Sequence, residues 1–527
     1  MSVAMESPDI GTSPRWQRVC GLEDIVPETG VAALVGGQQV AIFRVRDGVH
    51  ALGNFDPASG ANVLSRGLVG DYSGELVVAS QIYKHHYSLV SGRCLEEPEL
   101  AVPTFLARIS SGQIWVRSEP ISQRIRPARR RLVVVGNGMA AMRAVEELLD
   151  LAPGACEITV FGAEPHGSYN RILLSPLLAG DRRLEDIVTH PPEWYAERGI
   201  TLHCGDPIVH IDRARRCVRS RLGVNLEYDR LLLATGSSPV VLPIPGRDLP
   251  GVMTFRDVQD VDAMLAAARQ HHRAVIIGGG LLGLEAAHGL KLNGMDVTVV
   301  HLAAHLMERQ LDAQAGALLR AELEGRGLKF ALGAQTAQIL GERQVRGVRL
   351  ANGENIAADL VVMAVGVRPN VELARAAGLR CDRGVLVDDT LATYDPAIYA
   401  VGECVQHRNA TFGLVAPLWD QARVCAAYLA ERGVRRYRSG QFPTQLKVSG
   451  VDVFSAGNYA DGEGVESLVL RDPSRGVYKR VVLEGNRVRG AVLYGDTRDG
   501  AWYSELINER RDVSAFRDQL LFGAPGQ

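Results

Sequence analysis

The sequence predicts an α/β protein with an all-β domain at its N-terminal end and a small α+β domain at its C-terminal end. In the middle of the chain, a strand, a glycine-rich turn and a helix follow one another twice, which is the pattern of nucleotide-binding folds. The flanking segments show short apolar runs separated by turn residues, a pattern typical of antiparallel strands. At about 150 residues per domain, a chain of 527 residues also excludes a single-domain protein.

The N-terminal all-β domain is expected over residues 1–120. Its apolar runs cover residues 31–35, 40–45, 76–79 and 113–116, with Gly, Asp and Ser between them. Residues 121–131 are expected to form a solvated linker, because the segment QRIRPARRR has five Arg, one Pro and no apolar periodicity. A docking patch is the alternative interpretation of this basic stretch.

Two strand–turn–helix units define the central part of the chain. The first has a strand at 132–135, GNGMAA at 136–141, a helix to about 151 and a strand at 158–161. The second has a strand at 274–277, GGGLLG at 278–283, a helix to about 293 and a strand at 296–300. We expect one domain in two parts, 132–250 and 371–435, interrupted by a second domain, 251–370. The C-terminal domain, 436–527, has strands at 467–470, 479–483 and 489–494 and a helix near 501–507.

Both glycine turns have the residues that a dinucleotide site needs. A pyrophosphate binds backbone N–H groups at a helix N-terminus, and the turn must be tight enough for it to approach them. In the first unit Gly136 makes the turn, Gly138 removes a blocking side chain, and Ala141 is small where helix meets strand. The second turn repeats the pattern with Gly278, Gly280 and Gly283. One such motif is weak, but two in the same context predict two dinucleotide sites.

Three further segments extend these sites. LLLATGSSP at 231–239 is a strand that ends in a turn of small residues, Thr235 and Gly236 among them, which is able to approach the first site. VVMAVGVRP at 361–369 repeats this arrangement around Gly366 for the second site. YAVGE at 399–403 ends a strand with Gly402 and Glu403, whose carboxylate is able to accept hydrogen bonds from polyol hydroxyls.

With these segments, the chain from about residue 131 to 431 resembles the two-dinucleotide flavoprotein reductases. In that family the first turn holds FAD, the inserted second turn holds NAD(P)H, and the late Gly-Asp/Glu pair contacts the ribityl chain. The resemblance implies FAD on the first set of residues, with Glu164 at its adenosine ribose, and NAD(P)H on the second glycine turn. It also implies that Glu285 is the acid found near the nicotinamide and the flavin ring, with an exposed helix carboxylate as the alternative.

The nucleotide preference depends on the residue that follows the strand at 296–300. An acid there would accept a hydrogen bond from the 2′-hydroxyl of NADH, but this chain has His301. No Arg follows at once to receive a 2′-phosphate, since Leu302, Ala303 and Ala304 come next. We expect NADH rather than NADPH, with His301 a neutral neighbour of the nucleotide and not a catalyst.

The segment SYNRILLSP at 168–176, which includes Arg171, indicates the branch of the family. It has no cysteine beside the flavin site. The chain therefore lacks the nucleophile that peroxidases, disulfide reductases and water-forming oxidases use. Ferredoxin reductases usually have a Lys where this chain has Pro176. YNRILLS, HLAAHLMERQLD at 301–312 and YAVGECVQHRNATFGLVAP at 399–417 instead resemble the reductase region of the large subunit of assimilatory nitrite reductase. They are equally similar to the flavoprotein electron-transfer subunits of assimilatory nitrate reductase.

The N-terminal domain resembles a Rieske domain without its cluster ligands. FDPASGA at 55–61 and SQIYKHHYSL at 80–89 occupy the two loops that carry the motifs CxH and CxxH. The four ligand positions hold Asp56, Ala58, Ser80 and Tyr83, whereas a Rieske [2Fe–2S] centre needs two thiolates and two imidazoles. The domain is therefore similar to the cluster-free small subunit of assimilatory nitrite reductase, and we expect no metal site in it.

Composition excludes several other classes of function. A net charge of −2 gives no basic excess for nucleic acid. The eight cysteines are scattered with no CxxC pair, which argues against zinc, a redox dithiol or an iron–sulfur centre and is typical of a reducing cytosol. Because there is no signal-like start and no apolar run of about 18 residues, we expect a cytoplasmic protein that does not span a membrane.

The sequence thus predicts an FAD-dependent NAD(P)H oxidoreductase whose only redox centre is the flavin. Electrons would pass from NADH through FAD to a separate metal-containing subunit of assimilatory nitrate or nitrite reduction. Two alternatives stay open: a reductase of another ferredoxin- or rubredoxin-type acceptor, and a non-enzymatic flavoprotein redox sensor. The cluster-free domain would act as an adaptor that docks the partner, or it would order the flavin domain. The choice between nitrate and nitrite and the oligomeric state are not determined by the sequence.

Overall fold

The chain divides into two compact units, residues 1–128 and 129–527. The computed structural model describes residues 16–46, 48–72, 75–97, 99–121, 129–433, 435–440, 443–448 and 450–524. Residues 122–128, most of the expected linker, lie outside this range, so the linker and docking interpretations of the basic stretch both stay predictions.

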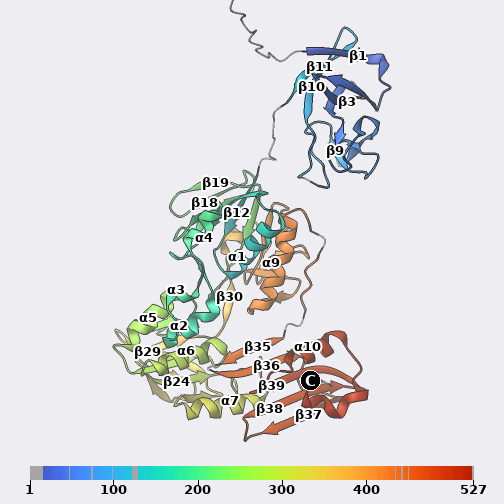
Figure 1. The fold of residues 1–527 in the computed structure, drawn as a ribbon. Coiled ribbons are helices and arrows are strands. Elements are labelled where there is room, and N and C mark those ends of the chain that lie inside the picture. Colours follow the sequence, from blue (N-terminus) through green and yellow to red (C-terminus); the bar gives the residue numbers. More distant parts are fainter. Residues whose placement is uncertain are drawn as a thin grey trace, which may run out of the picture. The chain divides into compact units, whose positions relative to one another are not determined.

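The N-terminal unit is all β, as predicted (Figure 1). Its main antiparallel sheet has the order β1-β11-β10-β4-β3-β2, and a smaller sheet has the order β7-β8-β9. The strands of the main sheet are β1 (Trp16–Gly21), β2 (Thr29–Val35), β3 (Gln38–Val45), β4 (Gly48–Gly53), β10 (Thr104–Ser110) and β11 (Gln113–Pro120). The remaining strands are β5 (Phe55–Asp56), β6 (Ala61–Asn62), β7 (Leu68–Tyr72), β8 (Glu75–Ala79) and β9 (His86–Ser88).

The second unit begins with an α/β domain built on a parallel sheet of order β16-β13-β12-β20-β32. Along β12 the residues alternate between two cores: Leu132 and Val134 pack with helices α1 and α9, and Val133 and Val135 pack on the other face. A parallel strand covered on both sides needs this continuous apolar run. The sheet and its two helices comprise β12 (Arg130–Val135), β13 (Cys156–Phe161), β16 (Thr201–His203), β20 (Arg230–Leu233), β32 (Ile398–Ala400), α1 (Met139–Leu151) and α9 (Val415–Leu429).

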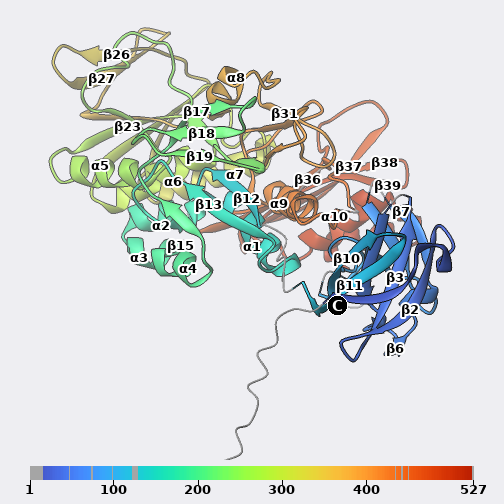
Figure 2. The same cartoon turned by 90° about the horizontal axis from the view of Figure 1, so that it is seen from above.

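Smaller elements accompany this first α/β domain along the chain, but two of them, Leu174–Ala179 and Leu184–Ile187, pack in the core of the second α/β domain. A three-stranded antiparallel layer, β17–β19, lies beside the sheet of the first domain (Figure 2). These elements are β14 (Ser168–Tyr169), α2 (Leu174–Ala179), α3 (Leu184–Ile187), β15 (Val188–His190), α4 (Pro192–Glu197), β17 (Ile208–Asp212), β18 (Cys217–Ser220), β19 (Asn225–Glu227), α8 (Glu372–Ala376), β31 (Val385–Val387), β33 (Val405–His407) and β34 (Ala410–Thr411).

The inserted second α/β domain repeats the design with the order β22-β29-β23-β24-β25. Ala274 and Ile276 of β23 pack with helices α6 and α7, and Val275 and Ile277 pack with the antiparallel layer β26–β28 on the other face (Figure 2). Its elements are β22 (Val252–Thr254), α5 (Val258–Ala268), β23 (Arg273–Ile277), α6 (Leu281–Leu292), β24 (Asp296–His301), α7 (Ala313–Gly325), β25 (Lys329–Leu332), β26 (Thr336–Gly341), β27 (Val345–Leu350), β28 (Asn355–Ala357) and β29 (Leu360–Met363). The two domains are joined by a short antiparallel pair, β21 (Ser237–Pro239) and β30 (Val367–Pro369).

The C-terminal domain is an antiparallel sheet of order β35-β36-β39-β38-β37 with a helix, as predicted. Its residues Tyr478 and Tyr494 belong to the same apolar core as the second α/β domain. The Tyr478 hydroxyl also donates to Asp312 at 2.7 Å, at the N-terminus of α7. The elements are β35 (Thr444–Val448), β36 (Val451–Gly457), β37 (Val465–Asp472), β38 (Val477–Glu484), β39 (Arg487–Tyr494) and α10 (Gly500–Glu509).

The structure differs from two of the expected domain boundaries. Arg130 and Arg131, which composition assigns to the linker, begin β12 and pair with Cys156 and Glu157 of β13. Tyr437, assigned to the C-terminal domain, packs in the core of the first α/β domain. Both differences arise from long-range packing that the local sequence pattern does not contain. Among the described residues, no helix is both long and apolar enough to cross a membrane.

Candidate functional site

The first glycine turn connects β12 to α1 and lies against β20. Gly136 has φ +110°, and a Cβ there would lie 2.1 Å from the carbonyl oxygen of Ala234, so no other residue fits. A Cβ on Gly138 would meet no atom within 4 Å, which leaves the space before the helix N-terminus open. Ala141 is fully buried where α1 meets the sheet. The turn therefore presents the free N–H groups of α1 to an open space.

A cavity of about 970 Å³ opens in front of this turn. It brings together ten of the residues singled out in the sequence, although they are distant along the chain. They are Gly136, Gly138, Ala141, Glu164, Arg171, Thr235, Gly236, Glu285, Gly402 and Glu403. Residues of the first α/β domain line most of it, α6 of the second domain contributes Glu285, and the C-terminal domain contributes Thr444 and Gln445.

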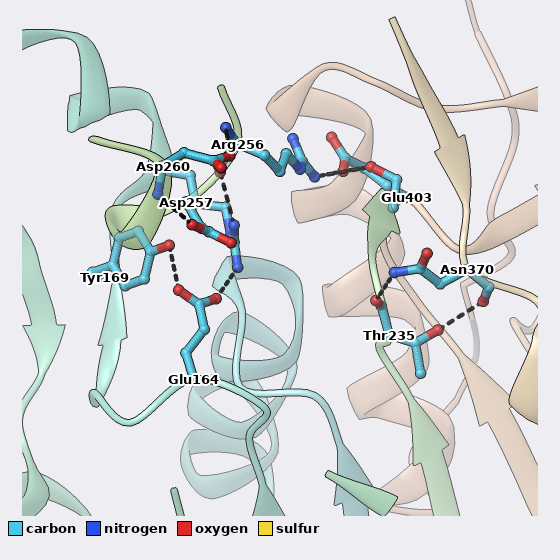
Figure 3. Close-up of polar contacts among 10 residues, drawn as sticks. Glu164, Tyr169, Thr235, Arg256, Asp257, Asp260, Asn370 and Glu403 are labelled. Atoms are coloured by element: carbon cyan, nitrogen blue, oxygen red, sulfur yellow. Dashed lines mark hydrogen bonds and ion pairs between the residues drawn. The ribbon is translucent and has the colours of Figure 1, made fainter. Parts of the chain in front are cut away.

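Glu164 lies on the cavity wall as the centre of a polar cluster (Figure 3). Its carboxylate accepts a hydrogen bond from the Tyr169 hydroxyl at 2.7 Å and one from the Arg171 guanidinium. Burial raises the pKa of Tyr169, which keeps its hydroxyl protonated and able to donate. Arg171 also donates to the backbone carbonyl of Arg256 at 3.0 Å. Arg171 thus links the carboxylate to the second α/β domain.

Arg256 is a site residue that the sequence analysis missed. Its guanidinium pairs with Glu403 and donates to the Ser237 hydroxyl at 2.9 Å, while Ser237 donates to Glu403 at 2.6 Å (Figure 3). The side chains of Arg256 and Glu403 are only 17% and 15% exposed. Asp260 fixes the Arg256 backbone by accepting its N–H at 2.6 Å. Because 147 residues separate the two partners, no local motif could have indicated this pair.

Two buried polar atoms on residues that line the cavity have no hydrogen-bond partner. They are Nδ2 of Asn137, in the first glycine turn, and Nε of Arg256. Buried donors without partners are uncommon in folded proteins, and at a cavity wall they indicate groups that bind a ligand. Asn137 was also missed, since it occupies a variable position of the glycine motif.

Glu285 lies in α6 and faces the cavity from the second α/β domain. Burial raises its pKa to about 7, and the Ser175 hydroxyl of α2 opposes the shift by donating to its carboxylate at 2.5 Å. A carboxyl group that titrates near neutral pH within a cavity is typical of a functional site. Its interpretation as an exposed helix carboxylate is wrong, because the residue is half-buried and its carboxylate accepts a hydrogen bond from Ser175.

The second glycine turn has the same construction, but its glycines do not line this cavity, whereas Leu281 and Leu282 do. A Cβ on Gly278 would lie 2.3 Å from the carbonyl oxygen of Ala364, and one on Gly283 would lie 2.0 Å from the carbonyl oxygen of Gly278. Gly280 again faces open space. The turn lies at the carboxyl end of β23, where ligands of parallel sheets bind.

His301 and Gly366 lie near the second turn rather than in the cavity. His301 is 8% exposed, and both of its ring nitrogens are engaged, one with the Gly279 N–H and one with Glu308. It therefore presents no free nitrogen to a ligand. Gly366 has φ +122° and its carbonyl accepts from the Val240 N–H at 2.9 Å, which joins the segment to the connection between the domains.

Thr235 forms part of that connection as well as lining the cavity (Figure 3). Its hydroxyl donates to the Asn370 carbonyl at 2.9 Å, and the Asn370 amide donates back to the Thr235 carbonyl at 2.8 Å. Gly236, beside it, accepts from the Asn370 N–H at 3.0 Å. These bonds hold the turn after β20 against the segment that returns from the second domain.

In the N-terminal unit, a hydrogen bond joins two of the four positions where a Rieske domain has cluster ligands, Asp56 and Ser80. Asp56 is fully buried and accepts hydrogen bonds from the Ser80 hydroxyl at 2.5 Å, the Tyr87 hydroxyl at 2.7 Å, the Ser59 hydroxyl at 2.8 Å and the Ala58 N–H at 3.0 Å. Burial alone would raise the pKa of Asp56, but the bonds from Ser80, Tyr87 and Ser59 outweigh it and hold this pKa below its ordinary value. The carboxylate therefore ties the two loops together through hydrogen bonds.

His85 and His86 also do not form a ligand set. His85 pairs with Glu97 at 3.2 Å, and His86 pairs with Glu96 at 2.5 Å. Within the part of the chain that the structure describes, no three His, Cys, Asp or Glu residues are grouped so that they could hold a metal ion.

Fold and site together define a protein with two adjacent dinucleotide-binding folds, the arrangement of an oxidoreductase. Residues 130–426, more than half of the chain, match the family model of the pyridine nucleotide-disulphide oxidoreductases, and the chain belongs to this family. Residues 15–117 match the Rieske-like [2Fe-2S] domain, and residues 443–511 match the rubredoxin NAD+ reductase C-terminal domain. The predicted fold class and the FAD/NAD(P)H-binding class of oxidoreductase are thereby confirmed.

Curated relatives confirm the predicted branch of the family. Over 386 residues the chain is 49% identical to a nitrite reductase [NAD(P)H] of Bacillus subtilis, covering 73% of this chain and 48% of that protein. Over 393 residues it is 42% identical to the assimilatory nitrate reductase electron transfer subunit of Bacillus subtilis, covering 75% and 51%. The chain thus spans about half the length of these relatives. Among solved structures, the covalent putidaredoxin reductase–putidaredoxin complex is similar with a TM-score of 0.67, 27% identity and coverage of 76% and 96%.

The Asp56 network predicts an acid-sensitive N-terminal unit. The pKa of Asp56 is lower in the folded than in the unfolded protein. Its carboxylate therefore stabilises the fold fully above the unfolded pKa of about 4, and this stabilisation is lost as the pH falls through the folded pKa. Asp56→Asn should destabilise the unit by about 2 kcal/mol at neutral pH and remove part of this acid dependence. Hydrogen exchange of residues 55–89 between neutral and acid pH measures both effects. Glu99→Gln, at an exposed site, is the control, and equal protection in Asp56→Asn and wild type would contradict the prediction.

Proposed function

We propose that this protein takes electrons from NADH through FAD and passes them to a separate metal-containing reductase of nitrate or nitrite assimilation. The observation that carries the proposal is the single cavity that joins the first glycine turn, the carboxylates Glu164 and Glu403, and Glu285 of the second domain. A flavin bound along the first glycine turn and the two carboxylates would reach the part of the cavity wall that the second α/β domain forms.

The residues of the cavity fit FAD. Gly136 and Gly138 leave room for a pyrophosphate at the N-terminus of α1, and the unpartnered Nδ2 of Asn137 and Nε of Arg256 are donors that such a group would satisfy. Glu164 would accept from the adenosine ribose and Glu403 from the ribityl hydroxyls. Bound FAD would supply the chemistry, accepting a hydride from NADH and releasing electrons singly.

Glu285 would stabilise the charge that develops during hydride transfer. The nicotinamide ring becomes positive as the hydride leaves, and a half-buried carboxylate beside it favours that change. Ser175 would orient the carboxylate and hold it in the ionised form through its hydrogen bond. NADH is the proposed donor, with NADPH as the alternative.

The N-terminal unit would serve as an adaptor without an iron–sulfur cluster. Asp56 and Ser80 stand where a Rieske centre needs thiolates, and they hydrogen-bond to each other instead. FAD would therefore be the only redox centre, and electrons would leave for an acceptor outside the chain. Phe55 and Tyr83, on the two joined loops, are 50% and 63% exposed and offer apolar surface to a partner. All eight cysteines are free thiols, which supports a reducing, cytoplasmic location.

A second candidate acceptor is a ferredoxin- or rubredoxin-type protein. The match of residues 443–511 to a rubredoxin NAD+ reductase C-terminal domain favours it. So does 33% identity to the biphenyl dioxygenase system ferredoxin–NAD(+) reductase component of Paraburkholderia xenovorans, of which the chain covers 94%.

Anaerobic reduction of the purified flavoprotein tests the core of the proposal. NADH should bleach the flavin absorbance, and turnover with ferricyanide should continue at an enzymatic rate, which would exclude a pure sensor. Adding the metal subunit that co-purifies should give nitrate- or nitrite-dependent NADH oxidation. Activity with a ferredoxin and not with that subunit would favour the second candidate, and a flavin that NADH leaves oxidised would defeat both.

Glu285 should impose a pH dependence on flavin reduction. Because its pKa is raised to about 7, the carboxylate ionises through neutral pH, so the rate constant should rise with pH in that range. Glu285→Gln should lower the rate by about tenfold at high pH and remove the inflection. Ser175→Ala should instead move the inflection to higher pH, because it removes a hydrogen bond to the carboxylate. Stopped-flow reduction by NADH measures all three proteins, and an inflection that persists in Glu285→Gln would contradict this role.

Removing residues 1–119 should separate docking from flavin chemistry. Because the N-terminal unit is compact by itself, NADH–ferricyanide activity should stay within about twofold of the full chain, while transfer to the physiological acceptor falls by about tenfold or more. The double variant Phe55→Ser, Tyr83→Ser keeps the unit and should reproduce the second effect alone. Loss of both activities on deletion would indicate a structural role instead.

A further inference from the structure

The loop after β24 folds back onto the second glycine turn and clamps one peptide of it. The Gly279 N–H donates to Nδ1 of His301 at 3.1 Å, and the Gly279 carbonyl accepts from the Met307 N–H at 3.0 Å. A Cβ on Gly279 would lie 2.7 Å from Cγ of His301, so the imidazole packs directly on this peptide. The loop is therefore fixed to the turn where a nucleotide would bind.

This loop holds a strained residue next to an acid. Met307 is fully buried and has φ +53°, a conformation that non-glycine residues adopt only when their surroundings impose it. The following residue, Glu308, has its carboxylate 3.0 Å from Nε2 of His301 and is 37% exposed. The strain and the clamp together bring an accessible carboxylate to the end of β24.

The hydrogen bonds define the charge of this pair. Because Nδ1 accepts from Gly279, the ring proton is on Nε2, which donates it to Glu308. His301 is then neutral, and the pair carries the negative charge of Glu308. Of the other charged or titratable side chains on the loop, His305 bonds the Leu311 carbonyl at 3.2 Å, and Arg309 is exposed after Glu308.

We propose that Glu308, positioned by His301, selects NADH over NADPH. Dinucleotide-binding folds of this type place an acid at the end of the second strand to accept from the adenosine ribose, and here Glu308 supplies that acid from seven residues further on. The carboxylate accepts hydrogen bonds from ribose hydroxyls and repels a 2′-phosphate. This inference rests on the proposed function and specifies NADH as its electron donor.

Calorimetric binding of ADP-ribose and of 2′-phospho-ADP-ribose to the full-length protein tests the selection without flavin chemistry. Wild type should bind ADP-ribose more tightly. Glu308→Gln should shift the ratio of the two affinities toward the phosphorylated ligand by about tenfold, and Glu308→Arg should shift it further. Glu354→Gln removes the same charge from the exposed turn between β27 and β28 and should leave the ratio within about twofold of wild type.

A double-mutant cycle tests the role of His301. His301→Phe keeps a ring against Gly279 but removes both nitrogens, so it should lower the discrimination as Glu308→Gln does. Adding Glu308→Gln in that background should then change little, because the two residues act as a unit. Fully additive effects would overturn the positioning role.

Two results would overturn the selection itself. One is an unchanged affinity ratio in both Glu308 variants. The other is a wild-type preference for the phosphorylated ligand that Arg309→Ala abolishes, which would make Arg309 a phosphate ligand. The ratio of kcat/KM for NADH and NADPH with ferricyanide should follow the binding ratio. If neither nucleotide reduces the flavin, the proposed function fails, while the calorimetric ratio still decides on Glu308.

Discussion

The second unit depends on two places where backbone segments approach so closely that no side chain fits between them. At Gly136 and Gly278, a Cβ would lie 2.1 and 2.3 Å from the carbonyl oxygen of the adjacent parallel strand. This approach occurs where β12 neighbours β20 in the first sheet and where β23 neighbours β29 in the second, and the helix that follows each turn begins with free N–H groups. The neighbouring strand and the start of the helix are therefore brought together at one glycine in each sheet.

The parts of the site that the sequence predicts are those whose physics is local. A glycine turn between a buried strand and a helix is specified by a few consecutive residues, and both turns have the predicted construction. Glu403 could be predicted in the same way, because it comes shortly after a strand in the sequence. Arg256 could not be predicted, because its role depends on meeting Glu403 and Ser237 across the domain boundary. The bond between Ser175 and Glu285 likewise joins helices 110 residues apart.

In the N-terminal unit, the sequence shows that the cluster-ligand motifs are absent, but it does not show which contacts hold the two loops together. The ligand motifs are absent from the sequence, and this is visible residue by residue. What holds the two loops in the absence of those ligands is not visible there, because Tyr87 is 31 residues from Asp56 and belongs to no motif. A buried carboxylate with four donors satisfies the requirement that buried charge be hydrogen-bonded.

The shared core of the C-terminal and second α/β domains has a mechanical consequence. Tyr478 and Tyr494 pack among residues of the second domain, and Arg480 pairs with Asp312 at 3.2 Å, so the two domains are fixed to each other. The C-terminal domain also supplies Thr444 and Gln445 to the cavity wall. A displacement of the second α/β domain would therefore also move this part of the cavity wall.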